Sequence, residues 1–161
     1  MIHNLKYRFA AGIADPLSGI MTKALLKHGL PIPDFIVPVP LHPRRLRWRG
    51  FNQSLLLAEK IAEELIPPLK IRVLNALKRQ KYNRPQVEIS NYSERFENVK
   101  DVFSLGGDSP EVRSKTILLV DDIATTGATL EKCAKALKEA GAKKVFAVVV
   151  ARQSISQKTD S

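Results

Sequence analysis

One segment in the C-terminal half constrains the fold more than any other part of the chain. A continuous apolar run over Thr116–Val120 is typical of a strand that is buried on both faces. A polar turn over Asp121–Thr126 follows, then helical apolar spacing over Gly127–Ala140, with Gly141 as a stop, and a second apolar strand over Val145–Ala151. This order predicts a βαβ unit with parallel strands and a right-handed crossover.

The rest of the chain alternates helices and strands in the same way. Helices are predicted where apolar residues recur every three or four positions, and strands where short apolar runs lie between turn residues. The predicted elements are helices over Pro16–His28 and Asn52–Ile66, strands over Asp34–Val39, Arg72–Leu77 and Val102–Leu105, and a short helix from Ser90 or Ser93 to about Asn98. We therefore expect an α/β fold with an open, mainly parallel twisted sheet flanked by helices.

Size and composition exclude several classes of protein. The 161 residues fit one domain, and 44% hydrophobic residues with 26% charged residues argue against a disordered or fibrous chain. No apolar run approaches the roughly 18 residues of a membrane span, and no secretory signal is present, so we expect a cytoplasmic protein without membrane insertion. The single cysteine, Cys133, excludes an internal disulfide and is expected to be a buried thiol.

Positive charge is concentrated in the first part of the chain. The formal net charge is +10, and residues 1–100 carry 17 Lys and Arg against 8 Asp and Glu, whereas residues 101–161 carry 9 against 8. This excess favours a polyanionic partner, which includes phosphorylated metabolites, nucleic acid and anionic lipid.

Two adjacent acids, Asp121 and Asp122, follow the buried strand and precede small, hydroxylated residues that open a helix. Ligands of open parallel sheets bind beyond the carboxyl ends of the strands. The backbone amides of Thr125–Thr129 would hold a phosphate at the positive helix end, while the two carboxylates would accept hydrogen bonds from a ribose diol. The alternative is a capped helix with surface acids at its turn. Neither G-x-x-x-x-G-K-[ST] nor G-x-G-x-x-G is present, so the pattern predicts a sugar phosphate site.

This strand, turn and helix resemble the 5-phosphoribosyl-1-pyrophosphate (PRPP) signature of type I phosphoribosyltransferases. Upstream, residues 36–53 (IVPVPLHPRRLRWRGFNQ) are similar to the hallmark of the ComF family, which are competence-associated phosphoribosyltransferase-like proteins of bacteria. The resemblance covers nearly the whole chain and continues through Arg79, Gln86, Ser90, Arg95 and Asn98. Members of this family commonly begin with a cysteine-rich zinc module, and this chain is expected to correspond to the transferase part alone.

The resemblance implies a role for each matching residue. It implies Asp121, Asp122, Arg44 and Arg45 as catalytic residues, with Mg²⁺ as a cofactor held through PRPP and not by the protein directly. The 5′-phosphate would bind Ala124, Thr125, Thr126, Gly127, Ala128 and Thr129. The pyrophosphate would bind the loop Pro40, Leu41, His42, Pro43, Arg44 and Arg45, where guanidinium groups can donate two hydrogen bonds at once. A flexible lid over residues 78–88 would carry Lys78, Arg79, Lys81 and Arg84.

One phosphoribosyltransferase-like domain is expected over residues 1–153, with a helical hood over 1–30 and a polar, disordered tail over 154–161.

Two functions stay open. The first is a PRPP-binding transferase with a role in DNA uptake. The second is a non-catalytic competence factor that keeps the PRPP site and binds single-stranded DNA, for which Trp48 between Arg47 and Arg49 would supply base stacking. A PRPP sensor would differ from the first only in forming no product. Expected partners are PRPP, single-stranded DNA, competence or replication proteins, and a second copy of the chain.

Overall fold

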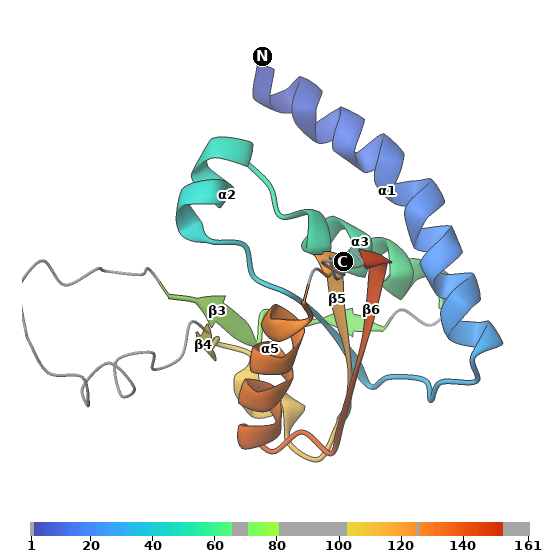
Figure 1. Cartoon of the computed structure of the whole chain (residues 1–161), viewed down its shortest axis with the longest axis vertical. Helices are drawn as coiled ribbons and strands as arrows, with labels where there is room; N and C mark the ends of the chain where they lie inside the picture. Colours follow the sequence, from blue (N-terminus) through green and yellow to red (C-terminus); the bar gives the residue numbers. More distant parts are fainter. Residues whose placement is uncertain (1, 66–70, 81–102, 125, 153–161) are drawn as a thin grey trace, which may run out of the picture.

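The computed structural model describes residues 2–65, 71–80, 103–124 and 126–152. Within these residues, four strands form a parallel sheet with the order β2-β1-β5-β6 (Figure 1). These strands are β1 (Phe35–Pro38), β2 (Arg72–Val73), β5 (Thr116–Ala124) and β6 (Lys144–Arg152). A separate antiparallel pair consists of β3 (Leu77–Arg79) and β4 (Phe103–Leu105). The predicted α/β class with a mainly parallel sheet is confirmed.

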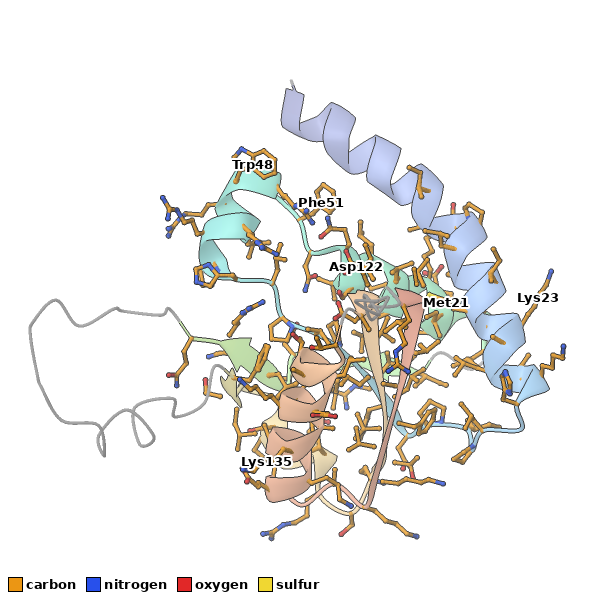
Figure 2. All side chains as sticks on the ribbon, in the orientation of Figure 1. Met21, Lys23, Trp48, Phe51, Asp122 and Lys135 are labelled. Atoms are coloured by element: carbon orange, nitrogen blue, oxygen red, sulfur yellow. The ribbon has the colours of Figure 1, made fainter. Side chains whose placement is uncertain are left out.

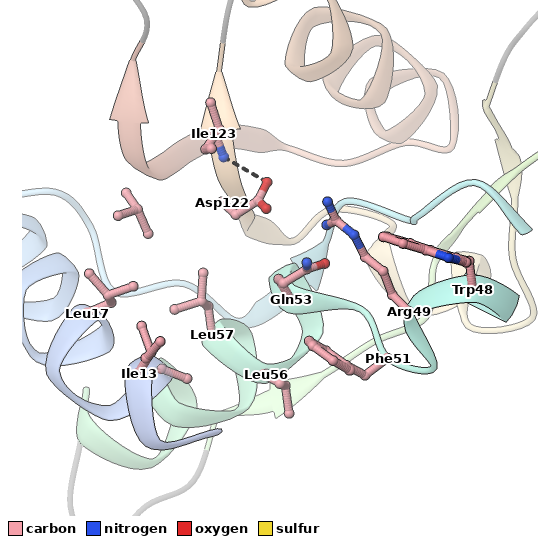
Figure 3. A pocket seen from close by; sticks show the side chains of 12 residues that line it. Ile13, Leu17, Trp48, Arg49, Phe51, Gln53, Leu56, Leu57, Asp122 and Ile123 are labelled. Atoms are coloured by element: carbon pink, nitrogen blue, oxygen red, sulfur yellow. Dashed lines mark hydrogen bonds between the residues drawn. The ribbon is translucent and has the colours of Figure 1, made fainter. Parts of the chain in front are cut away.

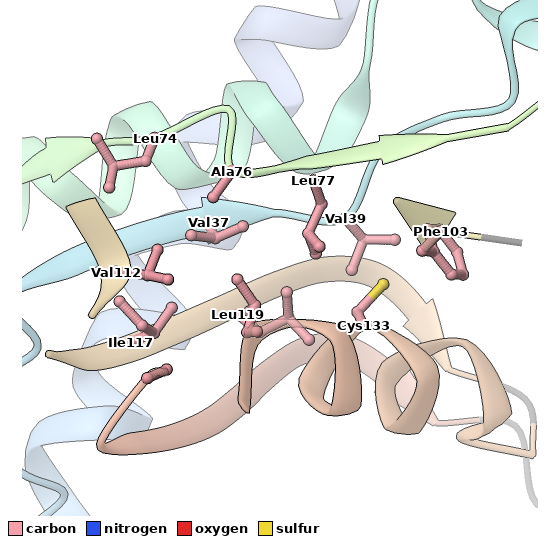
Figure 4. Packing of buried hydrophobic residues seen from close by; sticks show 12 residues of the cluster. Val37, Val39, Leu74, Ala76, Leu77, Phe103, Val112, Ile117, Leu119 and Cys133 are labelled. Carbon is pink, nitrogen blue, oxygen red and sulfur yellow. The ribbon is translucent and has the colours of Figure 1, made fainter. Parts of the chain in front are cut away.

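Helices cover both faces of the parallel sheet and give the domain three layers (Figure 1). The described helices are α1 (Ile2–Lys27), α2 (Pro43–Arg49), α3 (Gln53–Glu64) and α5 (Ala128–Glu139), with a 3₁₀ turn over Ser109–Val112. Leu118 and Val120 of β5 are buried in one core with α1 and α3. Ile117 and Leu119 are buried in a second core that contains Cys133 of α5 (Figure 4). Because β5 is buried on both faces, its residues Ile117–Val120 are all apolar.

Two strand boundaries differ from the sequence predictions. β5 continues to Ala124 because its pairing with β6 continues to Ala124 and Arg152, so the turn that was predicted from Asp121 begins later. The strand predicted over Arg72–Leu77 is two strands, because β2 pairs with β1 whereas Leu77 pairs with Leu105 in the small sheet. Both differences arise from pairing partners that lie far away in the sequence.

The first helix is longer than the predicted helix over Pro16–His28, and its buried face differs. α1 passes through Pro16, which is exposed, where a missing backbone donor costs less than it would in a core. Ile20 belongs to the apolar spacing that predicts this helix, but 65% of it is exposed, and the buried apolar positions of α1 are Ala14, Met21 and Leu25. In the described part of the chain, neither α1 nor any other helix is long and apolar enough to cross a membrane.

Cys133 is expected to resist thiol reagents in the native protein. Its side chain is fully buried beside β5, and burial, with a smaller contribution from the charge of Asp121, raises the pKa of the thiol to about 12. Because the thiolate is the reactive form, alkylation by iodoacetamide at neutral pH should proceed only after unfolding. Mass spectrometry of native and urea-unfolded protein checks this, and rapid alkylation of the native protein would contradict the burial.

Candidate functional site

The carboxyl end of β1 lies beside the middle of β5. Pro38 is paired with Val120, and the backbone N–H of Val39 donates to the carbonyl of Val120 at 2.9 Å. The chain therefore leaves β1 toward Pro40 next to the point where β5 reaches Asp121. The predicted pyrophosphate loop, which follows β1, and the acid pair, which lies within β5, are thus brought close together although they are far apart in the sequence.

Asp121 is a buried carboxylate held by two donors. Only 8% of this residue is exposed. Its Oδ1 accepts a hydrogen bond from the Ser54 hydroxyl at 2.9 Å and another from the backbone N–H of Asp122 at 2.9 Å. Burial raises the pKa of Asp121 to about 6, while the bonds from Ser54 and from Asp122 act in the opposite direction. Asp121 is therefore ionised at neutral pH and protonated in mild acid.

Asp122 lies in a different environment from its neighbour. It is half-buried, its Oδ1 accepts from the backbone N–H of Ile123 at 2.8 Å, and it lines a cavity of about 490 Å³ on the α1 and α3 side of the sheet (Figure 3). Adjacent residues of a strand point to opposite faces. The two predicted acids consequently present one buried and one accessible carboxylate.

Asn52 connects the first turn of α3 to the loop after β1. Its side-chain Nδ2 donates to the carbonyl of Val39 at 3.0 Å, and its Oδ1 accepts from the backbone N–H of Ser54 at 3.1 Å, which caps α3. Ser54 in turn donates to Asp121. Sequence reasoning did not assign a role to Asn52 or Ser54. The cap preference of Asn before a helix was available as a signal for Asn52, whereas nothing local indicates the contact between Ser54 and Asp121.

The predicted 5′-phosphate turn leads from β5 into α5. Gly127 has a φ of 84°, a left-handed conformation that glycine adopts easily, and α5 begins at the next residue. The N-cap residue Gly127 has no side chain that could cap α5, and the hydroxyl of Thr126 accepts from the backbone N–H of Ala128, the first residue of the helix, at 3.3 Å. Thr125 lies outside the described residues, whereas Ala124 is buried and Thr129 is in the first turn of the helix. The turn therefore presents the start of α5 beside the acids.

The predicted pyrophosphate loop is partly a helix, because its last three residues, Pro43, Arg44 and Arg45, belong to α2. Pro40 and Leu41 lead out of β1, and α2 starts at Pro43, where a proline in the first turn is favourable. The Nδ1 of His42 accepts from the backbone N–H of Arg44 at 3.2 Å, so His42 orders the loop as a helix cap. Gly50, with a φ of 85°, ends the helix. Arg44 and Arg45 are exposed on α2.

The first two residues of the predicted lid lie in a strand. Lys78 and Arg79 are paired strand residues of β3. The guanidinium of Arg79 lies over the ring of Phe103 at 5.4 Å, which fixes the side chain against β4. Lys81 and Arg84 lie outside the described residues, as do the predicted short helix ending near Asn98 and the tail from 154 onward.

The variant Ser54→Ala is expected to shift the pH dependence of ribose 5-phosphate binding. Losing the hydroxyl removes a hydrogen bond that lowers the pKa of Asp121, so the carboxylate becomes protonated at a higher pH. A protonated Asp121 is a poorer acceptor, so the affinity should fall as the pH decreases, and the midpoint of this fall should lie at a higher pH in the variant than in the wild type.

Calorimetric titrations between about pH 5 and pH 8 measure this midpoint. Ser54→Thr keeps a hydroxyl and should restore the wild-type profile, and the phosphate of the ligand titrates equally in all three proteins. Identical profiles for wild type and Ser54→Ala would show that Ser54 does not act through Asp121.

Comparisons with known proteins agree with the resemblance noted in the sequence. The phosphoribosyl transferase domain family matches residues 52–161. Competence protein F of Haemophilus influenzae is 37% identical over 119 residues, which are 73% of this chain and 50% of that protein. DNA utilization protein YhgH of Salmonella typhi is 34% identical over 146 residues, 88% of this chain and 61% of that protein. Competence protein ComFC of Streptococcus pneumoniae is 38% identical over 115 residues, 70% of this chain and 46% of that protein.

Solved structures share the fold at low sequence identity. Purine phosphoribosyltransferase from Pyrococcus horikoshii aligns with a TM-score of 0.50 and 19% identity, over 86% of this chain and 72% of that chain. Glutamine PRPP amidotransferase from B. subtilis aligns with a TM-score of 0.57 and 20% identity, over 86% of this chain and 27% of that chain. These likenesses establish the type I phosphoribosyltransferase fold alone.

The chain spans about half the length of the curated relatives that it matches. The domain match covers most of its residues, and three competence or DNA utilization proteins resemble it at 34–38% identity. The chain belongs to the phosphoribosyltransferase domain family and, within it, to the ComF family.

Proposed function

We propose that this chain binds PRPP with Mg²⁺ at the carboxyl edge of the sheet and transfers its 5-phosphoribosyl group in a process linked to DNA uptake. The observation that carries the proposal is the position of Asp121 and Asp122, which lie in the second half of the central strand β5, beside the loop after β1 and shortly before the start of α5. This arrangement offers carboxylate acceptors for a sugar between two groups of donors for phosphates.

Each part of PRPP would meet residues of complementary charge. The 5′-phosphate would accept hydrogen bonds from amides at the start of α5, near Gly127. The hydroxyls of the ribose would donate to the carboxylates of Asp121 and Asp122. The pyrophosphate would lie toward Arg44 and Arg45, whose guanidinium groups neutralise the charge that develops on the leaving group. The acids would also offset the positive charge that the ribose gains as pyrophosphate leaves.

The residues at this edge fit a magnesium ion that arrives with the substrate. Among the described residues, no three His, Cys, Asp or Glu side chains are grouped to hold a metal ion. Mg²⁺ commonly binds through one or two carboxylates together with substrate phosphates, and the half-buried Asp122 offers such an oxygen donor. When bound, Mg²⁺ adds positive charge that stabilises the leaving pyrophosphate.

Calorimetry of the intact protein with PRPP tests the proposal most directly. We expect saturable binding that requires Mg²⁺ and is lost when a chelator is added. No heat and no protection against thermal unfolding, with Mg²⁺ present, would overturn the proposal. Product analysis by mass spectrometry, after incubation with Mg²⁺, PRPP and a panel of bases and amines, separates transfer from binding alone.

A second candidate function is binding of single-stranded DNA. The exposed face of α2 favours it, since Arg44, Arg45 and Arg47 are exposed there and 72% of Trp48 is exposed. Basic groups beside an aromatic ring suit a phosphate backbone with stacked bases. Affinity for a single strand should then fall steeply with salt, and PRPP should compete with the strand if both use the same basic groups. Absence of binding at low salt excludes this function.

A further inference from the structure

A cavity beside Asp122 is lined mostly by residues that have no part in the proposed PRPP contacts. Its volume is about 490 Å³, within the usual range for small-molecule sites. It is built by α1, α2, the segment before α3, α3, β5 and β6, so residues from the whole length of the described chain form it. Most of its surface is apolar. Its walls are therefore suited to a ligand with an apolar body.

Polar side chains are gathered in one corner of this cavity. Figure 3 shows Asp122, Arg49 and Gln53 close together, while Ile13, Leu17 and Leu57 line the opposite side. Trp48 and Phe51 add aromatic rings to the same wall as Arg49. An occupant with complementary chemistry has a planar aromatic body for the apolar walls and hydrogen-bonding groups on one edge only.

The polar corner adjoins the proposed ribose site because Asp122 belongs to both. A ring bound in the cavity with its polar edge at Asp122 would therefore face the ribose of PRPP. We propose that the cavity is the acceptor site and takes a fused aromatic heterocycle with a single polar edge, an inference that rests on the proposed function. Purines are disfavoured, because a ring nitrogen turned toward Leu17 and Leu57 would lose its hydrogen bond to water without a replacement.

The transfer reaction is balanced with the groups present. The lone pair of a ring nitrogen forms the bond to C1 of the ribose, and the bond between C1 and the pyrophosphate oxygen breaks with its electron pair leaving on pyrophosphate. The ring then loses its N–H proton to the carboxylate of Asp122. No oxidant, reductant or further reactant is needed.

Benzimidazole and purine are matched probes for this acceptor site. Both are planar fused rings of the same size, and purine has two additional ring nitrogens on the side that would face the apolar wall. Trp48 is the only tryptophan of the chain, so its fluorescence reports occupancy of the cavity. We expect benzimidazole to quench Trp48 saturably and to bind at least about ten-fold more tightly than purine.

Ile123→Asn and Ile20→Asn form a matched pair of variants. Both residues are largely exposed, at 57% and 65%, but only Ile123 lines the cavity. Ile123→Asn should weaken benzimidazole binding about five-fold or more, whereas Ile20→Asn should leave it unchanged. With Mg²⁺ and PRPP added, mass spectrometry should detect the 5-phosphoribosyl derivative of benzimidazole.

The possible results separate this inference from the proposed function. PRPP binding without benzimidazole binding, or equal affinity for purine, overturns the acceptor site and leaves PRPP binding intact. Benzimidazole binding without PRPP binding overturns the proposed function and, with it, the role of the cavity in transfer. Analytical ultracentrifugation measures the oligomeric state with and without benzimidazole. If the protein is a dimer that benzimidazole dissociates, a second copy of the chain occupies the cavity, and this result also overturns the proposal of an acceptor site.

Discussion

The double variant Asp121→Asn/Asp122→Asn is expected to bind PRPP about 100-fold more weakly than the wild type, because each carboxylate supplies a charge-assisted hydrogen bond of about 1.5 kcal/mol or more to the ribose. Isothermal titration calorimetry with Mg²⁺ at neutral pH measures the change. The fold should persist, since asparagine has the shape of aspartate and its carbonyl oxygen still accepts from Ser54. Burial of the charged Asp121 carries a desolvation cost, which raises its pKa to about 6 in the wild type. The neutral asparagine of the variant does not have this cost.

A charge-matched control is Glu59→Gln/Glu139→Gln, which alters two exposed acids on α3 and α5 away from the sheet edge. Both double variants make the chain more basic by two charges, which by itself favours an anionic ligand. Weaker binding in the Asp variant alone therefore reports local contacts. If the Asp variant keeps wild-type affinity while melting cooperatively, these acids do not hold the ribose.

Gly106→Ala is expected to destabilise the domain by about 2–4 kcal/mol, because a methyl group there would collide with the carbonyl oxygen of Asn75 in the adjoining segment. The backbone N–H of Gly106 donates to the carbonyl of Ala76 at 2.8 Å, so the two backbones lie too close for any side chain. At this chain length the loss corresponds to a melting temperature lower by at least about 5 °C.

Gly107→Ala provides the control for that measurement, since a methyl group at Gly107 would contact nothing within 4 Å. Its melting temperature should equal or slightly exceed that of the wild type, because alanine restricts the unfolded chain. Thermal melts followed by circular dichroism compare the two variants. Equal melting temperatures would mean that the backbones at Asn75 and Gly106 move apart at little cost.

The βαβ unit shows how much local sequence determines here. The buried strand β5, the amphipathic helix α5 and the strand β6 each follow from a periodicity within about ten residues, and α5 and β6 occur close to their predicted positions. The place of Asp121 and Asp122 at the ligand-binding edge of the sheet follows as well, because parallel strands all end at the same edge. The predicted family and fold are confirmed by the domain match.

Short elements were predicted less well than long ones. α2 is only seven residues long, and its formation depends on the cap at His42 and the left-handed Gly50, so apolar spacing does not reveal it. β2 and β3 were joined into one predicted strand, because the chain between them moves to a different sheet at Leu74–Ala76. In both places the decisive interaction is a cap or a pairing partner, and periodicity carries no information about either.

The amino-acid sequence by itself determined the α/β class, the parallel βαβ unit of β5, α5 and β6, and the two acids that come after the apolar run of β5, since these depend on patterns that extend over a few residues. Only the tertiary structure decided that Asp121 is buried and bonded to Ser54, 67 residues away, while Asp122 lines the cavity. Burial and hydrogen bonding depend on which distant segments lie beside a residue. At this site, the packing of α1 and α3 against one face of the sheet determines which side chains surround the two acids.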